Sequence, residues 1–284
     1  MRDILQLVAA LVVVLALGAL GYRALFGGGQ AAPLVVESVS GDVLLRSQDG
    51  ERPAAVGEAL STDARLRSSA DGSAVLVTGT DTRLELKPSS SLRVVGADER
   101  GVLVELEGGR VQARVRPGSP AVGVLAEGRQ VDAVDGAFAV GLDLGGTVAV
   151  EALEGGVVLT GFGSAEGLAA GERVLAGEHG AIVGAVPSEL LLHVDWPSWN
   201  TTKEERVALE GTTDPGARVT ARAGERRVDG RAGPDGRFEL VVPLQQGDNA
   251  VVVEAQGVMG RVRRDEGDLE RDDQEPTAEI EIRF

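Results

Sequence analysis

The chain has 284 residues, with 28 Lys and Arg against 44 Asp and Glu, and a formal net charge of −16. Because binding to phosphate requires a basic surface, this balance argues against nucleic acid and against adhesion to anionic lipid. The absence of cysteine excludes a disulfide framework, a thiolate metal site or nucleophile, and a lipid-anchored lipoprotein.

The N-terminal segment is an apolar run from Ile4 to Tyr22 without a charged residue. At ~1.5 Å rise per residue, the run is long enough for a helix to cross the hydrocarbon core of a bilayer, about 30 Å thick. The sequence predicts a cytoplasmic stub at 1–3, a single transmembrane helix at 4–26 and a linker at 27–33. The alternative is a cleaved signal peptide, whose apolar core is usually shorter, about 7–15 residues.

The rest of the chain has the composition of β-structure. Forty glycines, many valines and few aromatic residues indicate short strands joined by tight turns. The length favours two domains. From 34 to 186, apolar and polar residues alternate in segments spaced about ten residues apart, which predicts an antiparallel sandwich, barrel or β-roll. The expected strands include Val43–Arg46, Ala74–Val77, Arg83–Lys87, Val102–Glu107, Arg110–Val115 and Thr147–Ala152, with turns at Asp49-Gly50, Asp71-Gly72, Gly108-Gly109, Asp135-Gly136, Gly145-Gly146 and Gly155-Gly156.

A series of weak motifs follows one another in a defined order over this region. They lie at Gly41–Leu45, Val56–Thr62, Gly72–Val77, Thr82–Leu86, Ser89–Leu92, Leu106–Val111, Ala137–Val140, Val148–Val157 and Leu168–Glu172. In this order the segments resemble the FecR family of bacterial envelope proteins. One departure is Gly136-Ala137, where family members often have Gly-Thr.

The resemblance implies a periplasmic β-domain behind a helix in the bacterial inner membrane. In well-known members a cytoplasmic region binds a sigma factor, while the β-domain senses an outer-membrane receptor. Only Met1–Asp3 stand in that position here, so we do not expect the sigma-regulator mechanism.

The second region begins with a junction at 187–204 and continues as a β-module at 205–284. Expected strands at Val207–Gly211, Ala217–Ala221, Arg237–Val242 and Ala250–Ala255 predict a small Greek-key sandwich. The motifs Gly211–Ala217, Asp235–Phe238 and Gly247–Asn249 resemble bacterial immunoglobulin-like modules of the glucodextranase domain B type. Such modules act as spacers, binders and adhesion elements, so the resemblance implies a fold and no function.

Both tryptophans of the chain, Trp196 and Trp199, lie in the junction. They are the candidate ligand- or partner-contact residues, because an indole ring stacks on a sugar or on a partner surface. The alternative is that they pack one domain against the next.

A dense acidic run extends from Asp265 to Glu275, with Arg271 as its one basic residue. We expect a solvated hairpin loop. The alternative is a carboxylate site for a hard cation such as Ca²⁺.

No catalytic constellation is found in the sequence. The histidines His179 and His193 have no paired carboxylate pattern, and there is no G-x-S-x-G elbow. Gly161–Gly167 resembles a phosphate-binding loop only faintly and is interpreted as a strand connection. We therefore expect no enzyme, no cofactor and no metal site.

The predicted function is that of a membrane-anchored envelope protein that binds or scaffolds other envelope proteins in the periplasm. One alternative is transmembrane signalling to a separate cytoplasmic partner, through Gln6 and the Gly18–Gly21 step within the helix. Another is a module that binds glycan or peptidoglycan.

Overall fold

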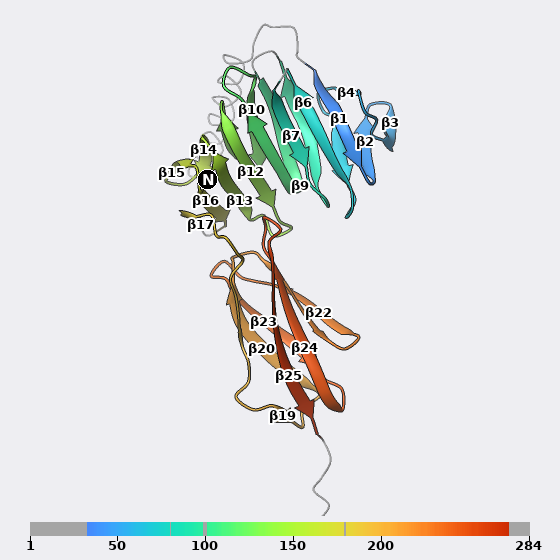
Figure 1. Ribbon diagram of the computed structural model, residues 1–284, viewed down its shortest axis with the longest axis vertical. Helices are drawn as coiled ribbons and strands as arrows, with labels where there is room; N and C mark the ends of the chain where they lie inside the picture. The colour runs from blue at the N-terminus through green and yellow to red at the C-terminus, as the bar shows by residue number, and fades with distance from the viewer. Residues whose placement is uncertain (1–32, 80, 99–100, 179, 273–284) are drawn as a thin grey trace, which may run out of the picture. The chain divides into compact units, whose positions relative to one another are not determined.

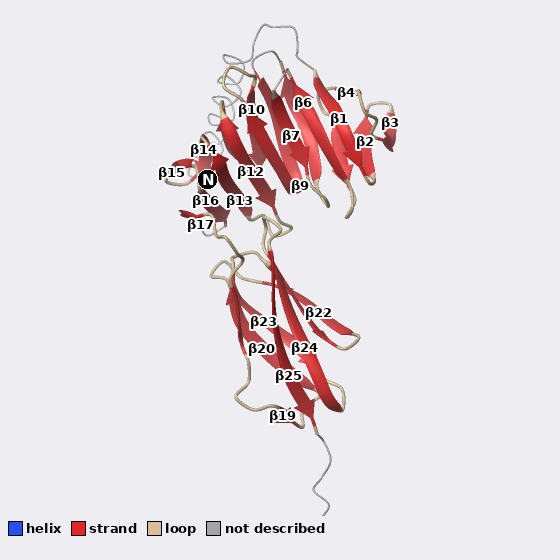
Figure 2. Cartoon of the chain, viewed as in Figure 1, coloured by secondary structure: helices blue, strands red, loops and turns tan. Residues whose placement is uncertain are grey.

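The computed structural model describes residues 33–79, 81–98, 101–178 and 180–272 (Figure 1). Strands make up 67% of these residues and there is no helix among them, which confirms the all-β prediction (Figure 2). The predicted stub and helix at 1–26, and the linker up to residue 32, lie outside the described residues. Within the described ranges, no helix is long and apolar enough to span a bilayer.

The chain divides into two compact units, 1–186 and 187–284. The strands of the first unit are β1 (Leu34–Ser40), β2 (Val43–Ser47), β3 (Gly50–Pro53), β4 (Ala59–Leu60), β5 (Arg65–Ser68), β6 (Ser73–Thr78), β7 (Thr82–Leu86), β8 (Ser91–Ala97), β9 (Gly101–Val115), β10 (Ala121–Ala126), β11 (Arg129–Ala133), β12 (Gly136–Leu142), β13 (Val148–Glu154), β14 (Gly156–Phe162), β15 (Ala165–Ala169), β16 (Glu172–Gly177) and β17 (Gly180–Ala185). Those of the second unit are β18 (Leu192–Asp195), β19 (Thr201–Thr202), β20 (Arg206–Thr213), β21 (Arg218–Ala223), β22 (Arg226–Arg231), β23 (Arg237–Pro243), β24 (Gly247–Gln256) and β25 (Val262–Arg271).

The first unit consists of two sheets that share one strand. The first sheet has the order β4-β1-β6-β7-β9-β12-β13-β16-β17. The second has the order β3-β2-β5-β8-β9-β10-β11-β14-β15. All neighbours are antiparallel except β9 and β10, and β9 is the middle strand of both sheets.

The shared strand β9 passes from one sheet to the other at its two glycines. Residues up to Gly108 pair with β8 and β10, whereas residues from Gly109 pair with β7 and β12. Gly109 has a φ of +81°, and a side chain there would lie 2.3–2.5 Å from atoms of Ser89 and Ser90. The predicted turn at Gly108-Gly109 is therefore wrong: the glycines bend a continuous strand. The second part of β9 also serves as the crossover that its parallel neighbour β10 requires.

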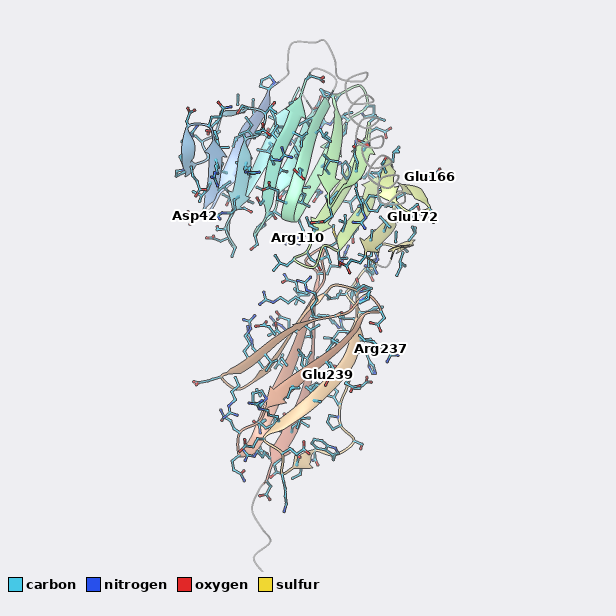
Figure 3. All side chains as sticks on the ribbon, turned by 180° about the vertical axis from the view of Figure 1, so that it is seen from behind. Asp42, Arg110, Glu166, Glu172, Arg237 and Glu239 are labelled. Carbon is cyan, nitrogen blue, oxygen red and sulfur yellow. The ribbon has the colours of Figure 1, made fainter. Side chains whose placement is uncertain are left out.

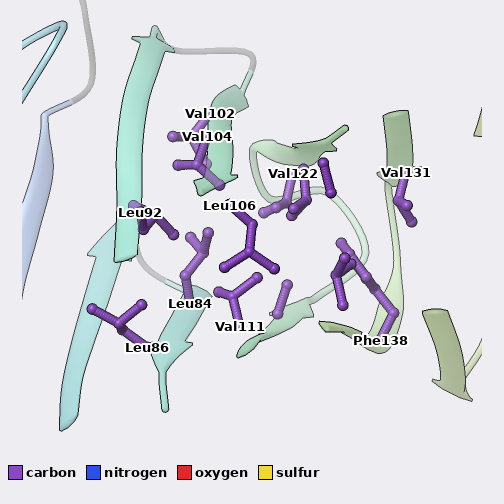
Figure 4. Packing of buried hydrophobic residues seen from close by; sticks show 14 of the residues in the cluster. Leu84, Leu86, Leu92, Val102, Val104, Leu106, Val111, Val122, Val131 and Phe138 are labelled. Carbon is purple, nitrogen blue, oxygen red and sulfur yellow. The ribbon is translucent and has the colours of Figure 1, made fainter. Parts of the chain in front are cut away.

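One hydrophobic core lies between the two sheets. The alternation in β6, β7 and β8 places every second residue inside, as the period-two pattern predicts. Figure 4 shows side chains from both sheets in this core, including Leu84, Leu106, Val122 and Phe138. Phe138 and Phe162 are its largest fully buried side chains.

The second unit is a smaller β-sandwich with its own core. One sheet has the order β18-β20-β23 and the other β19-β25-β24-β21-β22. The predicted strands of this region correspond to β20, β21, β23 and β24. Alternate residues of these strands, such as Leu209, Val219, Leu240 and Val253, form the core.

The acidic run does not form the loop that the sequence predicts. Asp265–Arg271 belongs to β25, which pairs with β24 from Gln256↔Val262 to Gly247↔Arg271. The partner strand explains the difference, because the long-range pairing with the valine-rich β24 overrides the low β-propensity of the acidic residues. The end of the run, from residue 273, lies outside the described residues.

Candidate functional site

Trp196 is built into the second unit directly after β18. Its ring packs against the core of that unit, and its Nε1 donates a hydrogen bond to Asp265 Oδ2 at 3.3 Å. One face of the indole lies on Gly267, where an added side chain would lie 2.7–2.8 Å from three ring carbons. The absence of a side chain at Gly267 therefore makes room for the indole ring. Trp196 has a structural role, because it holds the segment that follows it on β25.

Trp199 differs from Trp196 in its exposure. Its side chain is 42% exposed. It lines an open groove of about 190 Å³ between the segment after β18 and the strand β25. The lining residues are Trp196, Pro197, Ser198, Trp199, Asn200, Gly267, Asp268 and Leu269. We call this hollow the aromatic groove.

A second hollow borders the aromatic groove, because the two share Asn200, Asp268 and Leu269. Its volume is about 360 Å³. Its further lining residues, Asp248, Asn249 and Glu270, bring two more carboxylates to the site.

Backbone pairing fixes the segment that carries Trp199. The short strand β19 runs parallel to β25, with Thr201 opposite Glu270. The Glu270 amide donates to Asn200 O at 2.6 Å, and Thr201 Oγ1 donates to Glu270 Oε2 at 3.1 Å. Both ends of the segment from Trp196 to Asn200 are therefore tied to β25, so the indole of Trp199 is held at the groove.

The opposite wall of the second hollow is ordered by the buried Asn249. Its Nδ2 donates to the carbonyls of Gln245 and Gly247 at 2.8 Å each, and its Oδ1 accepts from the Gln245 amide at 2.7 Å. Asn249 thus closes the turn before β24 and leaves the exposed carboxylate of Asp248 at the rim.

The aromatic groove combines the partly exposed indole of Trp199 with the exposed Asp268, and the bordering hollow adds the exposed Asp248 and Glu270. An indole face attracts cations and the apolar faces of ring ligands. Carboxylates and the Asn200 amide accept or donate hydrogen bonds at the edges of such a ligand. The chemistry therefore suits a ligand that combines a flat or cationic group with hydroxyl or amine donors.

The acidic residues of β25 do not converge on one point. Successive residues of a strand face opposite sides, and arginines pair with acidic residues along the strand: Arg263 with Glu189 at 2.7 Å and Arg264 with Glu254 at 2.6 Å. Among the described residues, no three His, Asp or Glu side chains are grouped so as to hold a metal ion.

The other sequence candidates that the structure describes are not among the lining residues of the two hollows. His193 is exposed on β18, with its Nε2 3.2 Å from Asp195 Oδ1, and His179 lies outside the described residues. Gly161–Gly167 spans the turn from β14 to β15, which confirms its interpretation as a strand connection.

The sequence predicts Trp196 and Trp199 as contact residues together, and the structure shows that their surroundings differ: Trp196 packs against the core of the second unit, whereas Trp199 is 42% exposed. The sequence did not indicate the acidic residues of the two hollows, because Asp248 and Asp268 come together only through the pairing of β24 with β25. Asp268 belongs to the acidic run, but no sequence motif connects that run with the tryptophans.

Comparison with known proteins gives distant neighbours. No family model matches the chain, and no curated protein matches it. Among solved structures, it is similar to two crystal structures of a candidate anti-sigma factor from Parabacteroides distasonis, at 19% and 18% identity, each with a TM-score of 0.37. Each match covers 43% of this chain and 59% of the other, so the chain spans little more than half of that protein. A Ca²⁺-stabilised ice-binding adhesin of an Antarctic bacterium matches at 12% identity over 85% of this chain and 70% of that one, with a TM-score of 0.22. At these values the function must be argued from the residues of the chain itself.

Proposed function

We propose that the protein is a non-enzymatic, single-pass protein of the bacterial inner membrane, with a helix at 4–26 and the bulk of the chain in the periplasm. In this proposal, 34–186 is a FecR-like domain and 205–284 an Ig-like module. Support for the Ig-like module comes from the three-stranded sheet β18-β20-β23 and the β25-β24-β21 order of the other sheet, since Ig-type sandwiches combine two such antiparallel sheets.

Its role in this proposal is to bind or scaffold another component of the envelope. The observation that carries the role is Trp199, an indole 42% exposed, which lines the aromatic groove together with the exposed Asp268. Large aromatic side chains at the centre of a contact supply much of the binding energy of protein interfaces. A partner that presents Lys or Arg side chains fits this groove, because the groove is both aromatic and acidic.

The test is capture of partners from crosslinked envelopes with the full chain and with Trp199→Ala. The matched control is Val241→Ala, which removes a side chain of similar exposure, 47%, from β23 in the other sheet of the same unit. We expect a partner that is lost with Trp199→Ala and retained with Val241→Ala. Equal recovery with both variants would remove the groove from the proposal.

A second candidate ligand is a glycan such as peptidoglycan, favoured by the same groove. The apolar face of a sugar ring stacks on an indole, and its hydroxyls bond to side chains such as Asn200 and Asp268, which line the groove. Binding of the purified chain to a glycan array and to isolated peptidoglycan separates the two candidates. The glycan candidate requires binding without protein partners, and its loss with Trp199→Ala.

A further inference from the structure

The last strand of the first unit, β17, has an open edge. Among the strands that the structure describes, it pairs only with β16. It reads Gly180-Ala181-Ile182-Val183-Gly184-Ala185, with no charged residue and no proline. Ile182 and Val183 are 61% and 48% exposed. A neutral, apolar edge strand of this kind is a template for pairing with another strand.

The hydrogen-bond register determines which backbone N–H and C=O groups of β17 point away from β16. The amide of Val186 donates to Gly171 O at 2.8 Å, so the pair 171/186 is a hydrogen-bonded one. Because bonded and non-bonded pairs alternate in an antiparallel ladder, Gly184, Ile182 and Gly180 turn their backbone groups toward β16. The N–H and C=O groups of Ala181, Val183 and Ala185 then point away from the sheet.

The other sheet edges of this unit are protected. β3 carries Glu51, Arg52 and Pro53, and β4 has two residues. On β15 the amide of Ala169 donates to Glu172 Oε2 at 2.8 Å, and the strand carries the charge of Glu166. Figure 3 labels Glu166 on β15 and Glu172 on the adjoining β16. Charge, proline and shortness are the usual means of blocking an edge, and β17 has none of them.

We propose that two copies of this chain pair through β17, antiparallel and related by a two-fold axis at Val183. Val183 then faces Val183 of the second copy, and Ala181 faces its Ala185. These are the residues whose backbone groups point outward, so each of the three pairs forms the ladder bonds that the isolated edge lacks.

The side chains of β17 favour a second copy as the occupant. In this register Ile182 of one copy lies opposite Gly184 of the other, so a large side chain meets a glycine on both sides of the axis. The strand has no charge to repel its own copy, although the chain as a whole carries −16. The pairing is isologous and uses the unprotected edge of both copies, so it closes as a dimer and does not continue into a filament.

The first test uses the absence of cysteine in the chain. Directly opposite residues of a bonded antiparallel pair have Cα atoms about 5.5 Å apart. A Val183→Cys variant of the full chain in detergent should therefore give a covalent dimer with a short bismaleimide crosslinker. Val158→Cys is the matched control, because Val158 is 60% exposed but lies on β14, which has neighbours on both sides. Equal crosslinking of the two variants would overturn the proposal.

The second test uses proline. At Val183, proline removes an N–H that bonds to nothing within the ladder with β16, so we expect a folded monomer. At Ile182, proline removes a bond to β16 and we expect a lower melting temperature. Sedimentation of the full chain in detergent should show a concentration-dependent dimer that Val183→Pro abolishes with an unchanged circular dichroism spectrum. A chain that is monomeric throughout, or a dimer that survives Val183→Pro, would overturn the proposal.

Discussion

The two halves of the first unit, on either side of β9, each contribute four strands to each sheet, but their surfaces differ in charge and in exposed hydrophobic side chains. From 34 to 116 the sequence has eleven basic and thirteen acidic residues, whereas from 117 to 186 it has two basic and nine acidic ones. Of the large hydrophobic side chains that the described part of this unit leaves exposed, Val56 lies in the first half. The other six lie in the second half, namely Val134, Leu144, Leu153, Val158, Ile182 and Val183.

Ion pairs between side chains from different strands and turns lie on the surface of the first half. Arg93 bonds to Asp63 at 3.0 Å and to Glu105 at 2.9 Å, and Arg65 bonds to Glu107 at 2.8 Å. Such surface pairs add little stability, but charges on a sheet keep it from pairing with other chains. The first half is therefore the more charged of the two, and the proposed pairing through β17 falls in the half with few charges and most of the exposed hydrophobic side chains.

The largest effect is expected from the core that both halves share. Phe138 is fully buried in the second half, and Phe138→Ala should cost about 3–5 kcal/mol of unfolding free energy. Since the core is continuous, amides of β6 and of β13 should lose hydrogen-exchange protection together. Loss confined to β13 would show that the halves unfold separately. Tryptophan fluorescence cannot report this transition, because both tryptophans lie in the second unit.

The next effect concerns the strand that joins the halves. Gly109→Ala places a side chain against the backbone of Ser89 and Ser90 at a φ of +81°, and should cost about 3 kcal/mol. Gly108→Ala is the matched control, since no atom lies within 4 Å of its added side chain. Urea unfolding followed by circular dichroism measures both. Equal stability of the two variants would contradict the role of Gly109 as the bend.

Gly108 and Gly109 also show which parts of the fold can be predicted from the sequence. Period-two alternation predicts the strands on both sides of Gly108-Gly109, because burial on one face is a local property. It predicts a turn between them, since two glycines usually end a strand. The bend depends on Ser89 and Ser90, which approach only after β8 pairs with β9. In the same way Trp199 was predicted from its residue type, whereas the bordering hollow was not, because Asp248 and Asp268 meet only through the pairing of β24 and β25.

A smaller effect is expected from the ion pairs of the first half. Arg93→Gln leaves Asp63 and Glu105 without their shared cation, and should cost about 1 kcal/mol at low salt. The difference from the wild-type chain should shrink at about 1 M salt, where the Debye length falls to about 3 Å. Melting temperatures at the two salt concentrations measure it. A salt-independent loss would mean that Arg93 stabilises through packing of its aliphatic stem and not through charge.

The smallest effect concerns Asp132, an acid of the charge-poor half. Burial raises the pKa of Asp132, and the hydrogen bond from Gln130 opposes this only in part. Gln130 Nε2 lies 2.8 and 2.9 Å from the two carboxylate oxygens. An acid whose pKa is higher in the folded state than in the unfolded state binds protons more tightly when folded. The unit therefore loses stability as the pH rises through the raised pKa.

Asp132 can be compared with Asp229, an acid whose pKa is lowered and not raised in the folded state. Asp132→Asn should raise the melting temperature at neutral pH, and the gain should vanish below the ordinary Asp pKa of 3.8. Asp229 on β22 is the control: hydrogen bonds from Arg227 and then Thr220 lower its pKa, so Asp229→Asn should destabilise the second unit at neutral pH and lose that effect in acid. Tryptophan fluorescence follows the second unit alone, so a transition seen by circular dichroism and not by fluorescence belongs to the first unit. A fall in stability with Asp132→Asn at neutral pH would show that the charge of Asp132 is paired and stabilises the fold, as the charges of the first half do. The two halves would then not differ electrostatically at this position.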